Sequence, residues 1–198
     1  MKTNYILIDY ENIQPTEMTV LDPEQFHVIL FVGAKQHKIA FEVVSALQSW
    51  GPRAEYIKIS ETGANTLDFH IAFYIGQLAA HEADAYFHII SKDKGFDPLI
   101  QHLKGKKIRA GRLESIMDIP IVKAATAHTL PEKLTFIVTN LQQRGTAKPR
   151  TVTTLTSTIN TLFQKRLTET ELSLIIKELQ KQGSIIINDA KVSYTLSA

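Results

Sequence analysis

Short apolar runs alternate with amphipathic stretches through the first two thirds of this 198-residue chain. The apolar runs that we expect to be strands are residues 5–8, 27–32, 54–59, 86–90 and 107–110. The intervening stretches with apolar residues at helical spacing are residues 38–50, 65–80 and 98–103. Strands separated by helices in this order are typical of a parallel sheet covered by helices. The pattern therefore predicts an α/β domain built on a single sheet.

The strand pattern ends after Met117, and the chain changes character from Pro131 onward. Here we expect three helices and then a hairpin, at residues 134–141, 152–163, 168–182, 184–187 and 192–196. The third helix begins with Thr168-Glu169-Thr170-Glu171, in which a hydroxyl and a carboxylate can satisfy free backbone amides. Three helices followed by a hairpin is the order of a winged helix. We therefore expect two domains, residues 1–128 and a small winged-helix-like domain at residues 131–198.

The charge differs between these two parts, although the whole chain has a net charge of only +2. Residues 1–130 have 13 lysines and arginines against 15 aspartates and glutamates, whereas residues 131–198 have nine against five. A basic segment is a mild indication of a polyanionic partner, although a solvated basic surface is the more common explanation.

The chain has no cysteine. It can therefore have neither a disulfide framework nor a thiolate metal site, and its chemistry cannot use a thiol nucleophile. This composition, with a first apolar run too short for a signal peptide or a membrane span, predicts a cytoplasmic protein without a membrane partner. The motifs of P-loop hydrolases, dinucleotide oxidoreductases and serine hydrolases are also missing from the sequence, which argues against those classes.

Aspartates follow the ends of two expected strands. Asp9 comes directly after residues 5–8, and Asp93 follows residues 86–90 after two intervening residues. In open parallel sheets, ligands bind at the carboxyl ends of the strands. One such aspartate alone would be explained as a turn or a helix cap, but two at equivalent places indicate a site.

Two further aspartates are expected at the same edge. Asp97 lies four residues after Asp93, and a tight turn at Gly95 could bring both carboxylates together. Asp97 and the proline after it are also typical of a helix start, and the two roles are compatible. Asp68 lies in the first turn of the helix expected at residues 65–80, which follows the third strand and so starts at this edge.

Several carboxylates that converge without histidine or cysteine form a hard, oxygen-rich site. Such a site suits Mg²⁺ or Mn²⁺ better than zinc. These ions activate water and stabilise the charge that develops on a phosphoryl group. Hydrolysis of a phosphodiester is the reaction that this chemistry favours.

Three motifs in the chain resemble the acidic motifs of the PIN-like nuclease superfamily, especially its NYN branch. They are Asp9-Tyr10-Glu11-Asn12, Asn65-Thr66-Leu67-Asp68 and Ser91-Lys92-Asp93-Lys94-Gly95-Phe96-Asp97-Pro98. The third is the most specific, and the resemblance covers residues 5–112. It implies a three-layer α/β sandwich with a mostly parallel five-stranded sheet in the order 3-2-1-4-5, and PIN-like proteins often form homodimers.

Carried over position by position, the resemblance implies that Asp9, Asp68, Asp93 and Asp97 are the metal ligands and catalytic acids. Asn12 would be a supporting polar residue of the catalytic site. The implied cofactor is Mg²⁺ or Mn²⁺, and the implied substrate is RNA.

The roles of two further acidic residues and three basic residues around this set remain to be decided. Glu42 could imitate an acid that many PIN toxins take from an earlier helix, but its neighbours indicate an ordinary amphipathic helix. Glu11 could point into the site or away from it. Lys35, Lys94 and Arg112 fall on the expected edge, where such side chains can bind phosphates without reading sequence.

We therefore expect a metal-dependent endoribonuclease that cuts single-stranded RNA, with single-stranded DNA as a further candidate substrate. One alternative is a nucleic-acid-binding protein on a PIN scaffold with little catalysis, although a polyanion-binding site gains nothing from clustered carboxylates without metal. Another is an Asp-dependent phosphatase, because Asp9-Tyr10-Glu11 loosely resembles an aspartyl-nucleophile loop.

Overall fold

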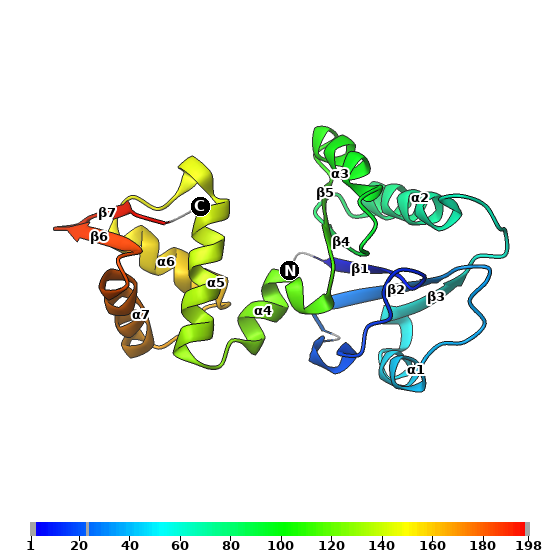
Figure 1. Cartoon of the computed structure of the whole chain (residues 1–198), viewed down its shortest axis with the longest axis horizontal. Coiled ribbons are helices and arrows are strands. Elements are labelled where there is room, and N and C mark those ends of the chain that lie inside the picture. Colours follow the sequence, from blue (N-terminus) through cyan, green and yellow to red (C-terminus); the bar gives the residue numbers. More distant parts are fainter. Residues whose placement is uncertain (1–2, 23, 197–198) are drawn as a thin grey trace. The chain divides into compact units, whose positions relative to one another are not determined.

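The computed structural model describes residues 3–22 and 24–196, and the chain divides into two compact units, Met1–Ile119 and Pro120–Ala198 (Figure 1). No helix within the described part of the chain is both long and apolar enough to cross a membrane.

The first unit is built on a parallel five-stranded sheet. Its strands are β1 (Asn4–Asp9), β2 (Phe26–Val32), β3 (Ala54–Lys58), β4 (Tyr86–Ile90) and β5 (Arg109–Leu113). They lie in the order β3-β2-β1-β4-β5, and all four neighbouring pairs are parallel. The central strands are buried almost throughout, which explains why their sequences are continuous apolar runs. The strand order expected from the sequence is confirmed.

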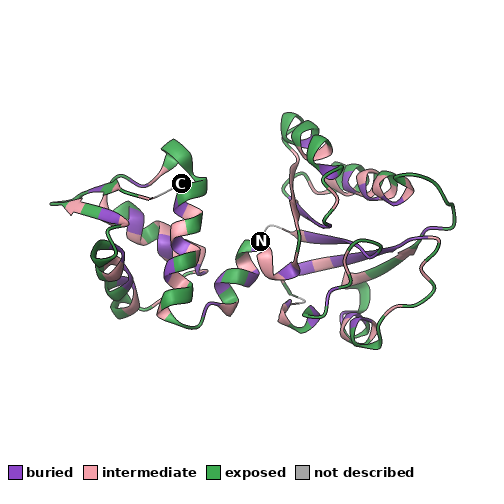
Figure 2. Cartoon of the chain, in the orientation of Figure 1, coloured by how far each residue is buried: buried purple, intermediate pink, exposed green. Residues whose placement is uncertain are grey.

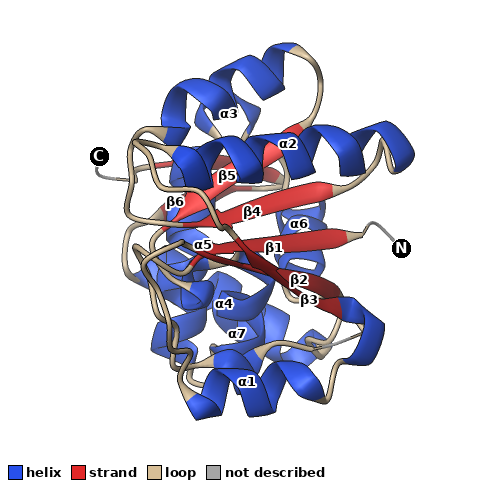
Figure 3. Ribbon diagram, turned by 90° about the vertical axis from the view of Figure 1, so that its right-hand side faces the viewer, coloured by secondary structure: helices blue, strands red, loops and turns tan. Residues whose placement is uncertain are grey.

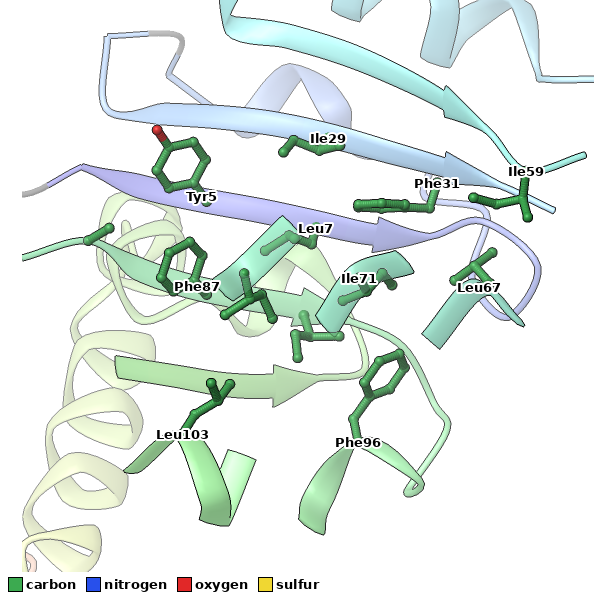
Figure 4. Close-up of a cluster of buried hydrophobic side chains, with 13 residues drawn as sticks. Tyr5, Leu7, Ile29, Phe31, Ile59, Leu67, Ile71, Phe87, Phe96 and Leu103 are labelled. Atoms are coloured by element: carbon green, nitrogen blue, oxygen red, sulfur yellow. The ribbon is translucent and has the colours of Figure 1, made fainter. Parts of the chain in front are cut away.

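Helices cover both faces of this sheet. They are α1 (Phe41–Gln48), α2 (Thr66–His81) and α3 (Phe96–Gly105), and Figure 3 shows α1 on the opposite side of the sheet from α2 and α3. On the α2 side, Leu7 and Phe87 from the strands pack with Ile71 and Leu103 from the helices (Figure 4). The unit is therefore a three-layer sandwich with a dry core on this face.

Several elements differ in extent from the expectation, among them β5 and α1. The strand β5 begins at Arg109 and not at residue 107, because Lys107 adopts a left-handed conformation with φ 62°. There the Ile108 amide donates to the Leu103 carbonyl at 2.9 Å and closes the end of α3. The helix α1 begins only at Phe41, since the preceding Ala40 amide donates to the hydroxyl of the buried Tyr10 at 3.0 Å.

The second unit consists of four helices and a hairpin. They are α4 (Pro120–Thr126), α5 (Leu130–Gln143), α6 (Val152–Leu162), α7 (Glu169–Lys181), β6 (Ile185–Asn188) and β7 (Lys191–Tyr194). A short 3-10 helix at Gly145–Ala147 also belongs to this unit, and three more, at Met18–Val20, Gly51–Arg53 and Ile116–Asp118, belong to the first unit. The second unit starts at Pro120, ahead of the expected start at residue 131, because Ala124 and Ala127 belong to its apolar core.

Threonines begin three helices of this unit. The hydroxyls of Thr129, Thr151 and Thr168 each accept a hydrogen bond from the backbone amide three residues later. The backbone amide of each threonine in turn donates to the side chain of that later residue. This arrangement is a capping box, which satisfies amides that have no partner inside the helix. The capping signature expected at Thr168 is confirmed.

Candidate active site

A pocket of about 410 Å³ lies at the carboxyl edge of the sheet. Its walls come from the loops that follow β1, β2, β3 and β4 and from the first turn of α2. Five carboxylates line it, from Asp9, Glu11, Glu61, Asp68 and Asp93. The expected edge of the sheet is therefore also where the acidic side chains gather.

Asp9 is the last residue of β1, and only 1% of it is exposed. Its Oδ2 accepts hydrogen bonds from Asn12 Nδ2 at 2.7 Å and Ser91 Oγ at 2.8 Å. Its Oδ1 accepts from the Asn12 backbone amide at 3.2 Å. These donors satisfy the buried carboxylate and fix its orientation. Asn12, expected as a supporting residue, thus holds Asp9 directly.

Ser91 connects Asp9 to the loop that carries Asp93. Besides donating to Asp9, its fully buried hydroxyl accepts from the Asp93 amide at 3.0 Å. The Asp93 carboxylate in turn accepts from the Gly95 amide at 2.7 Å and so shapes the turn before α3. The ends of β1 and β4 are therefore joined by one side chain. The sequence analysis did not select Ser91, although it belongs to the third acidic motif.

Asp68 faces the other acids from the first turn of α2. Burial, followed by the negative charges of Asp93, Asp9 and Glu11, raises the pKa of its carboxyl to about 6. The sensitivity of Asp68 to three other carboxylates shows that negative charge is concentrated in this pocket.

Glu11 also lines the pocket, so its side chain points into the site and not away from it, a question that the sequence left open. Its side chain lies over Gly33, where an added Cβ would stand 1.8 Å from Glu11 Oε1. A side chain at position 33 and the Glu11 carboxylate in its present place therefore exclude each other. Glu42, the other open acid, is exposed in the first turn of α1 and is not part of the pocket lining.

The loop after β2 is held in place by Lys58 at the end of β3. The Lys58 ammonium donates to the carbonyls of Gly33 at 2.6 Å, Ala34 at 3.2 Å and Gln36 at 2.6 Å. All three of its protons are used in this way. The loop carries Lys35 to the pocket wall, where the sequence analysis expected a phosphate-binding cation. No local sequence signal marks Lys58, because its partners lie more than twenty residues away.

Asp97, Lys94 and Arg112, which were expected in the site, are not among the described residues that line the pocket. Arg112 Nε donates to Asp97 Oδ1 at 2.9 Å, and its Nη1 donates to the Ser91 carbonyl at 3.1 Å. The Arg112 side chain is only 13% exposed. It therefore fastens β5 to the start of α3 and to the loop of Asp93. For Asp97 to bind a metal ion, its carboxylate would have to leave this guanidinium.

The donor set suits a hard divalent cation, because it consists of carboxylate oxygens with an amide oxygen close by and concentrated negative charge. Within residues 3–22 and 24–196, however, no group of three or more Asp, Glu, His or Cys side chains is arranged to hold a metal ion. Asp9 is instead occupied by its three donors. The residues therefore fit such an ion in their chemistry, but coordination would require side chains to turn.

The fold and the acid-lined pocket define a nuclease-type α/β protein, and the comparison with known families agrees. A model of the PIN domain matches residues 3–113, which is more than half of the chain, so the protein belongs to the PIN-domain family. PIN domains are typically nucleases that bind nucleic acids and usually use divalent metals. No curated protein matches the chain significantly. The matched region ends with β5 and leaves the second unit outside it.

Proposed function

We propose that the protein is a divalent-metal-dependent endoribonuclease that hydrolyses phosphodiester bonds of single-stranded RNA. The observation that carries the proposal is the gathering of Asp9, Glu11, Asp68 and Asp93 around one pocket of a PIN domain. Clustered carboxylates alone would repel RNA, because RNA is a polyanion. The proposal therefore requires a bound cation to make the local charge attractive to RNA.

In this proposal, Asp9, Asp68 and Asp93 hold Mg²⁺ or Mn²⁺, with Glu11 as a fourth carboxylate. When bound, the ion supplies an activated water and stabilises the charge that develops on the phosphoryl group. Asp97 is a further proposed ligand on the condition that it separates from Arg112.

The remaining residues position these groups and the substrate. Asn12 and Ser91 keep the Asp9 carboxylate oriented, and Ser91 also fixes the backbone of Asp93. Lys35 stands at the pocket wall, where its ammonium can contact a phosphate of the bound strand. Lys94 is proposed as a second phosphate contact, outside the pocket itself.

A phosphatase with Asp9 as nucleophile is less well supported. Asp9 is only 1% exposed, so a phosphorus atom has little access to its carboxylate oxygens. An activated water has no such restriction.

Finer assignments are also part of the proposal. We assign the PIN domain to the NYN type on its three acidic motifs, and residues 131–198 to a winged-helix-like module on the order α5-α6-α7-β6-β7. A cytoplasmic location and a homodimer are the remaining proposals.

The test is cleavage of a labelled oligouridine by purified protein with Mn²⁺ or Mg²⁺, with EDTA, and beside a small phosphomonoester. We expect metal-dependent cleavage of RNA alone. Cleavage that persists in EDTA would overturn the metal mechanism, and turnover of the phosphomonoester would favour a phosphatase. Binding of RNA without cleavage under any metal condition would favour the catalytically weak alternative, and a single-stranded DNA substrate separates the two nucleic acids.

A further inference from the structure

The turn between α5 and α6 is unusually basic. Arg144, Lys148 and Arg150 fall within seven residues, and Figure 2 shows most of this turn as exposed. Lys191, at the start of β7, is exposed as well. These four residues are called the basic surface below.

Backbone pairing brings the turn against the hairpin. The Val192 amide donates to the Arg150 carbonyl at 3.0 Å, and the Val152 amide donates to the Ala190 carbonyl at 3.0 Å. Thr151 therefore stands opposite Lys191 in an antiparallel bridge. This isolated bridge places Arg150 next to the strand of Lys191 although 41 residues separate them in the sequence.

Side chains fasten the turn around Tyr194. The Tyr194 hydroxyl donates to the Pro149 carbonyl at 2.6 Å, and Lys148 Nζ lies 6.0 Å from the centre of its ring. Lys148 also donates to the Gly145 carbonyl at 2.8 Å. Arg144 Nε donates to Asn140 Oδ1 at 2.9 Å, one turn earlier in α5. The cations are thus presented on a supported turn.

The described acidic residues of the second unit form no ion pair with this surface, although Asp189 lies in the hairpin turn two residues before Lys191. Residues 120–198 contain ten lysines and arginines against five acids, a net charge of +5. Glu132 and Glu171 are used in capping boxes, Glu171 also pairs with Lys133 at 2.8 Å, and Glu178 lies 3.7 Å from Lys181. Within the residues that the structure describes, no member of the basic surface forms an ion pair.

We propose that the basic surface binds the phosphodiester backbone of single-stranded RNA and so gives the substrate a second attachment outside the pocket. This inference rests on the proposed function for its choice of RNA. Unpaired cations on an exposed surface bind phosphates without reading the bases. A lipid surface is disfavoured, because no large exposed apolar side chain of the described chain lies within residues 144–150 and only one, Ile186, lies on the hairpin of Lys191.

The test compares two triple variants that remove the same charge from the second unit. The first is Arg144→Gln, Lys148→Gln and Arg150→Gln, and the matched control is Lys165→Gln, Arg166→Gln and Lys177→Gln, at three exposed positions elsewhere in the unit. Binding of labelled oligouridine is measured in EDTA over a range of salt concentrations, so that cleavage does not interfere. Far-UV circular dichroism checks that both variants are folded.

We expect the first variant to bind RNA about tenfold or more weakly than the control at low salt. The slope of log affinity against log salt should also fall by about 2, because each single-strand phosphate contact contributes about 0.7 to it. Equal losses in both triple variants would overturn the proposal, since they would show a general effect of net charge. If the first variant does not fold, Arg150→Gln with Lys191→Gln replaces it, because neither side chain holds the turn.

Two more measurements separate this proposal from its alternatives. In the first, polyglutamate and unlabelled RNA are compared as competitors of labelled oligouridine. Equally strong competition by polyglutamate would overturn the choice of RNA in favour of an acidic protein. Loss of binding to phosphatidylserine vesicles with unchanged RNA binding would overturn it in favour of a membrane. RNA binding that depends on the basic surface in a protein that never cleaves RNA would leave this proposal standing and reject the proposed nuclease.

Discussion

The two units treat buried polarity in different ways. The buried polar or charged residues among those described are Asp9, His88 and Ser91, and all of them lie in the first unit. The core of the second unit is apolar apart from the buried Asn160 Oδ1 in α6, which has no hydrogen-bond partner among the described residues, and threonine side chains begin three of its helices. Burying a charged group costs free energy unless it is well paired. The first unit carries this cost partly at the edge of its pocket, where Ser91 is hydrogen-bonded to Asp9, and partly within β4, where His88 contacts the Asn4 side chain.

The largest effect is expected from Asp93→Asn, which tests whether the acidic pocket is the functional part of the first unit. The variant should lose about a hundredfold or more of the cleavage rate, because loss of a ligand exceeds the 10–100-fold typical of outer partners. The apo protein should be no less stable, since the amide oxygen can still accept from Gly95 and one repulsive charge is gone. Cleavage rate and melting temperature are measured on one preparation, with and without Mn²⁺.

Asp22→Asn is the matched control for that variant. Asp22 likewise accepts from the amide two residues later, at 3.0 Å, but it is not part of the pocket. It should leave cleavage unchanged. Near-normal cleavage by Asp93→Asn with a lowered melting temperature would mean that Asp93 is structural.

The buried His88 should make the first unit sensitive to acid. Burial lowers the pKa of His88 to about 4, whereas an unfolded histidine titrates near 6.5. Between these values the unfolded chain binds the extra proton, so stability falls as pH drops, by about 3 kcal/mol over the whole window. The fluorescence of Trp50, the only tryptophan and a buried residue of the first unit, follows this unfolding.

The variant His88→Gln separates this effect from other titrations. It should flatten the fall in stability between pH 6.5 and 4 relative to the unmodified protein, whereas the exposed His81→Gln should not. The raised pKa of Asp68 has the opposite effect, because it makes the stability of the protein fall as pH rises. Asp68 is present in all three proteins, so its effect cancels in the comparison. An identical pH dependence with and without His88 would contradict the prediction.

Lys58→Met tests whether the pocket wall depends on one side chain. Loss of its three hydrogen bonds should release the loop at residues 33–36 and cost about 1–3 kcal/mol in stability. Because this loop carries Lys35, we expect KM for RNA to rise more than kcat falls. Lys58→Arg should restore part of the effect, and amide exchange of the loop reports its release directly. A lower stability with unchanged KM and unchanged amide exchange would show that Lys58 stabilises the fold without holding this loop.

The smallest effect is expected from Thr168→Ala in the second unit. Removing the cap of α7 should lower the stability of that unit by about 1 kcal/mol. Far-UV circular dichroism should register the change, while Trp50 fluorescence should not. Thr170→Ala, at an exposed position of the same turn, is the control and should have little effect. Equal effects of both substitutions would show that the capping box contributes nothing measurable.

The site residues that the sequence predicted correctly are those whose positions depend on neighbouring residues in the chain. Asp9, Asp68 and Asp93 were found because a strand end or the first turn of a helix fixes their place, and the structure brings all three to one pocket. The extent of β5 was wrong because the left-handed turn at Lys107 leaves no pattern in apolar spacing.

What the sequence missed depends on distant partners. The bond from Ser91 to Asp9 spans 82 residues, and the bond from Lys58 to Gly33 spans 25. The separation of Asp97 from the pocket follows from its pairing with Arg112 on β5. Such pairings exist only once the sheet is assembled, so no local pattern announces them.

The close approach of Glu11 to Gly33 has a consequence for how this protein can change over evolution. A methyl group at position 33 would push out the end of a flexible side chain and not the backbone, so Gly33→Ala can fold by expelling Glu11 from the pocket. Such a mutation would remove a negative charge from the acidic cluster without altering any acidic residue. We expect the two positions to covary among relatives, with glycine at 33 retained wherever a glutamate at 11 is in use.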